Sequence, residues 1–243
     1  MPRLYLFAEG QTELTFADKV LKPHLAHQGV YLQPPVLIAH ARKRGKVHRG
    51  GGRRYAPMKN DIVRFLAQEK GADVFFTTMI DLYSIAADTP GIAAAETLRH
   101  LPDKRVEALE QAFAEDIQDR RFVPYIQLHE YEAYLFSDPT CFAYFYERHE
   151  KQIAALQAIT DQYSTPELID DGQQSAPSKR IAAVIPDYED AKAAVGPQVA
   201  ELIGLDVIRR KCPHFAAWLS RLETLGADRP PTPPPPPAAA ADS

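Results

Sequence analysis

Residues 3–10 read RLYLFAEG, a short apolar run that stops at the acid Glu9 and the turn residue Gly10. Such a run is typical of a buried strand, and the apolar spacing over residues 12–26 predicts a helix after it. The same alternation continues along the chain, with strands predicted at 36–39, 74–80 and 122–128 and helices at 56–70 and 91–119. Strands that alternate with helices predict an α/β fold, in which a mostly parallel sheet is flanked by helices.

The remainder of the chain shows patterns of short helices and no further convincing strand pattern. We predict an α/β core over residues 1–138 and a helical C-terminal part over residues 139–227 that packs on this core. That part is either a helical layer on the same sheet or a small subdomain. Residues 228–243 are rich in proline and alanine, which predicts a disordered tail.

The overall composition excludes several classes of protein. The chain has 243 residues, of which 45% are hydrophobic, so it can form a core without disulfides or a structural metal. Cys141 and Cys212 are its two cysteines and predict reduced thiols. No apolar stretch approaches the ~18 residues of a membrane helix, and the opening run is too short for a signal peptide. These features predict a cytoplasmic protein.

Acidic residues follow three of the four predicted strands. The first strand runs into Glu9, the third into Asp81, and the fourth into Glu130 and Glu132. Because ligands of open parallel sheets bind outside the carboxyl ends of the strands, we expect these carboxylates to gather at one edge. Crowded carboxylates repel one another unless a cation lies among them. Oxygen ligands without a cysteine cluster favour Mg²⁺ or Mn²⁺ over zinc.

Basic residues supply candidate phosphate contacts. A segment without acids carries eight of them, and in a chain of net charge −4 this concentration predicts contact with a DNA or RNA backbone. A solvated loop is the alternative. Lys179, at a predicted helix start, is a candidate for stabilising charge on a transferred phosphoryl group, or else a surface cation. The eight basic residues are Arg42, Lys43, Arg44, Lys46, Arg49, Arg53, Arg54 and Lys59.

Two histidine-containing motifs have structural alternatives. His129, at the end of the fourth strand, is a general base, a partner that supports a metal ligand, or a structural residue. Cys212 and His214 have no matching pair that would complete a tetrahedral zinc site. We expect them instead to begin a helix that packs Phe215 and Trp218 into the core.

Several of these motifs together resemble one family. The set resembles a Toprim-like bacterial family of unknown function that is often encoded beside an AAA-type ATPase in apparent defence loci. The resemblance covers residues 3–225 and implies a Toprim fold, as in the overcoming-lysogeny-defect nucleases. Its motifs are EGQTE (9–13), TTMIDLY (77–83), HEYEA (129–133), LFSD (135–138), PSKR (177–180) and IRRKCPHF (208–215) with Trp218.

The resemblance assigns roles to individual acids. It implies that Glu9 is the first-motif acid and Asp81 the first aspartate of the second motif, which together organise Mg²⁺ for phosphodiester chemistry. The wider pattern has a second aspartate where this chain has Tyr83. Either Glu130 or Glu132 then completes the site, or the metal chemistry is weakened.

Residues and resemblance together predict a metal-dependent nuclease that cleaves phosphodiester bonds and acts as an effector of a defence system. The catalytic candidates are Glu9, Asp81, Glu130, Glu132 and Lys179, and the acids are also the metal candidates. Its partners would be DNA or RNA and, through the resemblance, an AAA-type ATPase; a homodimer is one open option. The alternative is a catalytically weak or inactive Toprim-like regulatory module that docks onto the ATPase. Phosphotransfer with small nucleotides is disfavoured by the long basic segment.

Overall fold

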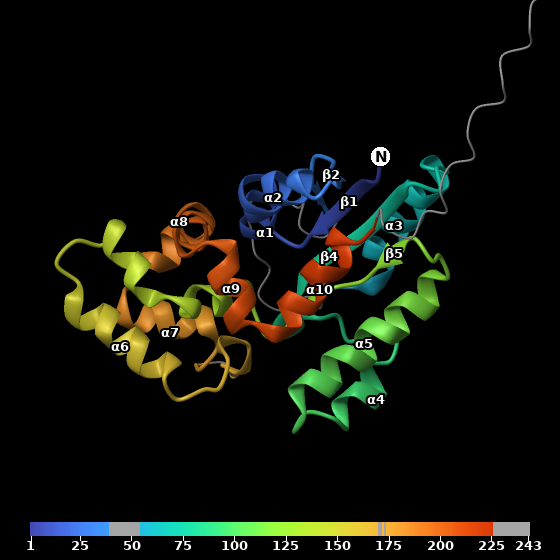
Figure 1. Cartoon of the computed structure of the whole chain (residues 1–243). Coiled ribbons are helices and arrows are strands. Elements are labelled where there is room, and N and C mark those ends of the chain that lie inside the picture. The colour runs from blue at the N-terminus through green and yellow to red at the C-terminus, as the bar shows by residue number, and fades with distance from the viewer. Residues whose placement is uncertain (39–53, 170–171, 173, 226–243) are drawn as a thin grey trace, which may run out of the picture.

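The computed structural model describes residues 1–38, 54–169, 172 and 174–225 (Figure 1). Its centre is a six-stranded sheet in which every strand pair is parallel. The main order is β2-β1-β4-β5, while β3 pairs with β1 and β6 with β4. The predicted parallel α/β sheet is therefore confirmed. The strands are β1 Arg3–Ala8, β2 Tyr31–Leu32, β3 Val36–Leu37, β4 Val74–Asp81, β5 Phe122–Val123 and β6 Ile126–Gln127.

The helices between the strands follow the predicted order. The predicted helix at residues 12–26 is continuous in the structure, although its middle, Ala17–Leu21, is a π-helical turn. The predicted helical stretch at residues 91–119 divides into two helices. These helices are α1 Gln11–Phe16, α2 Lys22–His27, α3 Tyr55–Gln68, α4 Ile92–Glu96 and α5 Pro102–Ile117.

Beyond residue 138 the described chain contains helices and no strand, as the sequence predicts. None of the described helices is long and apolar enough to cross a membrane. The predicted tail at residues 228–243 lies outside the described part of the chain. The helices of this part are α6 Glu150–Thr160, α7 Pro177–Val184, α8 Tyr188–Ile203, α9 Leu205–Lys211 and α10 Pro213–Glu223.

The predicted single strand at residues 122–128 is wrong in one respect, because it is broken into β5 and β6. Pro124 lies at the break and lacks the N–H that a sheet ladder needs. Thr78 of β4 compensates with its side chain: its Oγ1 accepts from the Tyr125 N–H and donates to the Tyr125 carbonyl, both at 2.9 Å. β5 ends the described strand order, which agrees with the edge position that Pro124 indicates.

Both faces of the sheet are covered (Figure 1). On one face, α3 and α5 bury side chains such as Ile62, Leu109 and Phe113. On the other, a single larger core combines residues of β1 with α1, α2 and the helices after residue 138. Burial on two faces explains why β4 reads as a nearly continuous apolar run, VFFTTMID.

The helix α10 packs directly on the central strand. The Trp218 ring stacks on Tyr125 with ring centroids 4.2 Å apart, and its Nε1–H donates to Thr77 Oγ1 at 2.9 Å. Cys212 and Phe215 are fully buried beside it. The prediction that residues 212–214 begin a core-packing helix is therefore confirmed.

Candidate functional site

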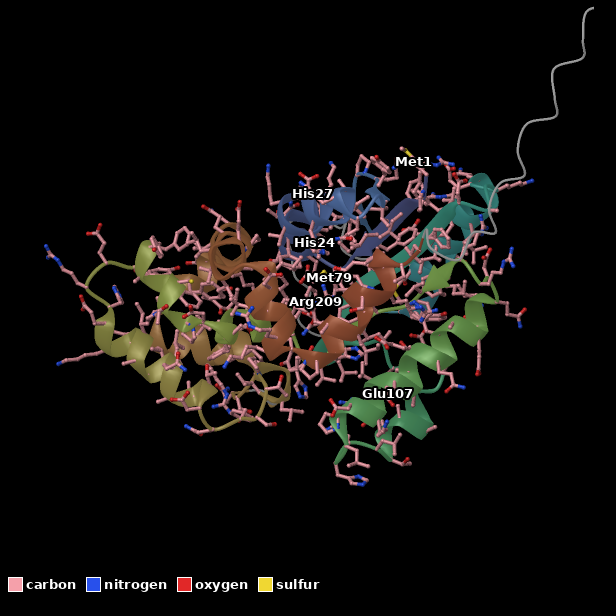
Figure 2. The ribbon with its side chains drawn as sticks, viewed as in Figure 1. Met1, His24, His27, Met79, Glu107 and Arg209 are labelled. Carbon is pink, nitrogen blue, oxygen red and sulfur yellow. The ribbon has the colours of Figure 1, made fainter. Side chains whose placement is uncertain are left out.

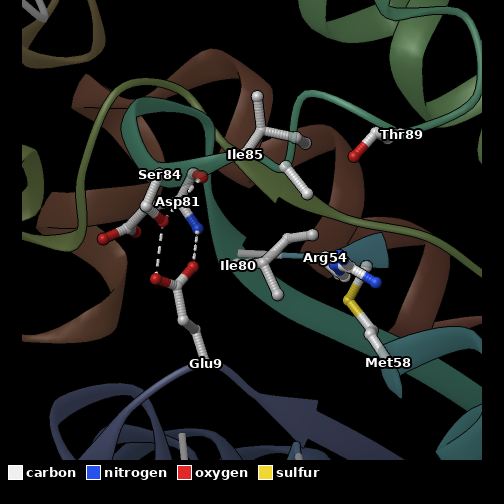
Figure 3. Close-up of a pocket in the computed structure, with 9 residues that line it drawn as sticks. Glu9, Arg54, Met58, Ile80, Asp81, Ser84, Ile85 and Thr89 are labelled. Carbon is white, nitrogen blue, oxygen red and sulfur yellow. Dashed lines mark hydrogen bonds between the residues drawn. The ribbon is translucent and has the colours of Figure 1, made fainter. Parts of the chain in front are cut away.

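Glu9 and Asp81 meet at the carboxyl edge of the sheet. They follow and end the neighbouring parallel strands β1 and β4, which are in register up to Ala8 and Met79. The Asp81 backbone N–H donates to Glu9 Oε2 at 2.9 Å, and the Ser84 hydroxyl donates to Glu9 Oε1 at 2.6 Å (Figure 3). Both oxygens of the buried Glu9 carboxylate are thus fixed in position.

The third acid-bearing strand end reaches the same edge. The Tyr131 N–H donates to Asp81 Oδ1 at 3.1 Å, and the Tyr83 N–H donates to the carbonyl of His129 at 2.9 Å. His129 is buried and has a φ of 65°, in the left-handed region, where the chain turns sharply after β6. The loop that carries Glu130 and Glu132 is therefore bonded to the strand that carries Asp81.

Three glutamates form a buried acid cluster next to this edge: Glu13, Glu130 and Glu132. Glu130 Oε2 accepts from the Ser178 N–H in the first turn of α7 at 2.9 Å. Glu13 Oε2 accepts from the Gly10 N–H at 2.9 Å. This is the helix-start role that a glutamate three residues after the cap position commonly has.

Burial makes two of these acids, Glu13 and Glu132, hard to ionise. Desolvation, followed by repulsion from Glu130, raises the pKa of Glu132 to about 8, although Lys192 opposes the shift. Desolvation also raises the pKa of Glu13, against opposing backbone hydrogen bonds and Lys192. Burial disfavours the charged form of a carboxyl group, and a nearby like charge adds to this effect. In the absence of a cation, Glu13 and Glu132 therefore retain protons at pH values where exposed glutamates have lost theirs.

The lysine whose charge acts on these acids is Lys192, which sequence reasoning missed. It lies on α8, where it influences both Glu13 and Glu132. Lys179, the predicted lysine, instead pairs with Glu189 Oε1 at 3.0 Å on a partly exposed surface. A signal for Lys192 does exist in the sequence, because it falls on the helix face of Tyr188, Val195 and Val199 at helical spacing.

Two of the eight predicted phosphate contacts can be placed. Arg54 is exposed and lines a pocket together with Glu9 and Asp81. Lys59 Nζ pairs with Asp116 Oδ2 at 2.8 Å and does not line this pocket. The other six lie outside the described residues: Arg42, Lys43, Arg44, Lys46, Arg49 and Arg53.

The donor atoms at this edge suit a hard cation with few protein ligands. Across residues 1–38, 54–169, 172 and 174–225, no three His, Cys, Asp or Glu side chains are placed to hold one metal ion together. A closed zinc-type site is therefore not formed by the described residues. Mg²⁺ commonly retains several waters and binds one or two carboxylates together with substrate phosphates. The pair Glu9 and Asp81 fits that mode of binding.

Ser84→Ala should loosen Glu9 without unfolding the protein. The change removes the hydroxyl that donates to Glu9 Oε1, and one lost hydrogen bond of this kind costs about 1 kcal/mol of stability. We expect divalent-metal affinity, measured by calorimetry, to fall roughly 5- to 10-fold, the equivalent of about 1 kcal/mol. Ser84→Thr keeps the hydroxyl and should retain most of the affinity. Equal affinities for Ser84→Ala and the native chain would show that Ser84 does not position Glu9.

Comparison with known proteins places the chain in a wider context. A family model described as "Domain of unknown function (DUF4276)" matches residues 8–223. Among solved structures, the C-terminal region of the Burkholderia pseudomallei OLD protein is similar, with 14% sequence identity and a TM-score of 0.42. That match covers 91% of this chain and 97% of the other, and a similarity at this level supports no argument about activity. No curated protein matches the chain.

Proposed function

The chain belongs to the DUF4276 family, whose description names no activity, and we propose that it is a metal-dependent nuclease. The observation that carries the proposal is the pairing of Glu9 and Asp81 at the ends of neighbouring parallel strands. Carboxylates in this position are suited to Mg²⁺ or Mn²⁺ and to phosphodiester chemistry. The resemblance of residues 9–13 and 77–83 to Toprim motifs supports the same assignment.

Each residue of the site would have a separate role. Glu9 and Asp81 would hold the cation, which supplies a bound water of lowered pKa and neutralises charge on the phosphate. Ser84 and the Asp81 N–H fix the Glu9 carboxylate. Arg54, exposed at the edge of the same pocket, is available to contact a backbone phosphate.

The buried acid cluster lies beside this pair and would supply negative charge near the cation, without a third direct ligand from the described residues, in place of the aspartate that Tyr83 replaces. Glu132 is the member with a pKa near 8, so a cation beside it would favour its ionised form. Glu130 is already held by the Ser178 N–H. Lys192 balances the negative charge of the cluster. These features support a site that uses one firmly bound cation.

The test of this function measures metal binding and cleavage on the same preparation. We expect calorimetry to detect Mg²⁺ or Mn²⁺ binding that Glu9→Ala and Asp81→Ala both abolish. Single- and double-stranded DNA and RNA would then be incubated with Mg²⁺ or with EDTA, with cleavage expected only with the metal. A native chain that binds no divalent cation, with or without an oligonucleotide, would contradict the proposal.

Lys192 and Lys179 offer a matched pair of variants. Lys192→Gln removes the cation that offsets Glu13 and Glu132, so we expect cleavage to fall at least ~10-fold, which corresponds to about 1.4 kcal/mol of barrier. Lys179→Gln removes only a partly exposed ion pair with Glu189, and such pairs contribute little. Initial cleavage rates of both variants at saturating Mg²⁺ provide the measurement. A larger loss in Lys179→Gln would restore Lys179 as the functional lysine.

A regulatory module is the second candidate. Tyr83 supplies no carboxylate, and the described residues include no three-ligand metal group; both observations favour docking onto a partner, such as an AAA-type ATPase in a defence system, without cleavage. Co-expression with that ATPase separates the candidates. A stable complex that forms equally with Asp81→Ala and cleaves nothing supports the module, whereas cleavage that requires Asp81 supports the nuclease.

A further inference from the structure

A small pocket adjoins Glu9 and Asp81 and has an apolar wall (Figure 3). Met58 of α3, Ile80 of β4 and Ile85 form much of this wall. The closed part of this space has room for about one or two water molecules, ≈ 20 Å³, and the space reaches ≈ 290 Å³ only when the part open to solvent is counted. An occupant can therefore insert only the edge of a ring, and the rest of the ring would lie outside the pocket.

A buried hydroxyl faces this pocket without a partner. Thr89 is 2% exposed, and its Oγ1 has no hydrogen-bond partner among the described residues. Its backbone is already fixed by the turn bond from the Thr89 N–H to the Ala86 carbonyl. Figure 3 shows the Thr89 oxygen directed toward the side chains of Ile80 and Ile85. A buried hydroxyl that lacks a partner destabilises the protein unless water or a ligand bonds to it.

A cation lies at the same pocket. Arg54 is exposed, and its guanidinium forms no hydrogen bond or ion pair with any residue that the structure describes. In the neighbouring loop, Asp88 Oδ1 accepts a hydrogen bond from the Tyr55 N–H at 2.8 Å. The pocket thus combines a phosphate-binding group, an apolar wall and one hydroxyl that needs a partner.

Each of these three features matches one part of a nucleotide. We propose that the pocket is a subsite for a single unpaired nucleotide of the strand whose phosphodiester lies at Glu9 and Asp81. Arg54 contacts its phosphate, the apolar wall packs on its base, and Thr89 bonds to a polar edge of that base. This subsite rests on the proposed nuclease function and narrows its substrate class to single-stranded or locally unpaired nucleic acid, because a base in the pocket cannot stay paired.

The first measurement is the affinity of the full chain for a labelled single strand and for its blunt duplex, by fluorescence anisotropy with Ca²⁺ in place of Mg²⁺. We expect the single strand to bind at least ~10-fold more tightly, since extruding a paired base costs a few kcal/mol. Thr89→Val should weaken single-strand binding about 5-fold, the effect of one hydrogen bond. Its thermal stability should equal or exceed that of the native chain, because the change removes the buried hydroxyl without changing the side-chain volume.

Two further variants test whether weaker single-strand binding is caused by the change in the pocket. Thr97→Val is the control, because Thr97 is exposed and its hydroxyl bonds only to the Ala94 carbonyl; it should bind as the native chain does. Ala86→Leu fills the pocket and should weaken single-strand binding at least as much as Thr89→Val. Mg²⁺-dependent cleavage is measured on all four proteins.

The outcomes distinguish the subsite from the function on which it rests. Weaker single-strand binding in Thr89→Val and Ala86→Leu, with Thr97→Val unchanged, supports the subsite. Cleavage by the native chain with native binding in both pocket variants overturns the subsite alone, as does tighter binding of the duplex. A native chain that neither binds nor cleaves any oligonucleotide overturns the proposed function and the subsite together.

Discussion

Asp81→Asn is expected to reduce cleavage about 10³-fold, which corresponds to about 4 kcal/mol of transition-state stabilisation. The substitution removes the charge that holds the cation but keeps the shape of the side chain. Asparagine Oδ1 can still accept the Tyr131 N–H that bonds to Asp81 Oδ1, so the fold should be retained. Glu9→Gln is less clean, because both Glu9 oxygens accept hydrogen bonds and an amide nitrogen cannot accept either. Cleavage rates and metal affinity are measured together.

Asp88→Asn is the matched control for this prediction. Asp88 lies seven residues farther along, and its Oδ1 likewise accepts a backbone N–H, that of Tyr55. It does not line the pocket with Glu9 and Asp81, so its amide variant should cleave at the native rate. If Asp81→Asn cleaves as fast as Asp88→Asn, then Asp81 holds no catalytic cation.

The free energy of unfolding should fall as the pH rises from about 4.5 to 8 when EDTA is present. The pKa of Glu132 is raised to about 8 from a usual value of 4.5. Between these values the folded state holds a proton that the unfolded state has lost, so stability declines with pH. At 1.36 kcal/mol per pKa unit, the decline from this residue is about 3–5 kcal/mol. Denaturant unfolding at several pH values measures it.

The other described groups with shifted pKa values do not reverse this slope. Glu110 raises the pKa of His214 against desolvation. That stabilisation is complete below the usual histidine pKa and is also lost as the pH rises. Among the residues that the structure describes, four carboxyl groups have lowered pKa values, so their contribution is lost only in acid, below this window: Glu96, Asp116, Asp119 and Glu223.

Glu132→Gln isolates the contribution of the buried glutamate. A neutral side chain cannot ionise, so the slope between pH 4.5 and 8 should flatten. Glu201→Gln is the control, since Glu201 is exposed on α8 and its variant should keep the native slope. An unchanged slope in Glu132→Gln would mean that Glu132 does not retain its proton in the folded protein.

The sequence predicted the parts of the fold that depend on local pattern. The apolar runs before Glu9 and Asp81 are strands, and the alternation with helices produces the parallel sheet. The two-residue strand β2 was missed because a run that short has no periodicity to read. The break at Pro124 depends on Thr78, which lies on another strand and supplies its hydroxyl. Tertiary compensation of this kind leaves no local signal.

The site could be predicted where it depends on strand ends and not where it depends on helix packing. The meeting of Glu9 with Asp81 follows from two neighbouring parallel strands. The proximity of Lys192 to the acids requires α8 to pack against α1, which strand patterns do not reveal. Thr89 could not be predicted either, because the lack of a partner for a hydroxyl is a property of three-dimensional packing.

The bond between Trp218 and Thr77 has a consequence for the time at which the protein becomes active. It joins residues 141 positions apart, and contacts of such long sequence separation form slowly. While the ribosome is still synthesising the chain, the strand that ends in Asp81 lacks the helix Pro213–Glu223 that packs over it. A nascent chain would therefore lack this cover on the strand that ends in Asp81 until residues 213–223 have been synthesised. For the proposed nuclease, such a delay would postpone activity beside the messenger RNA from which the protein is translated.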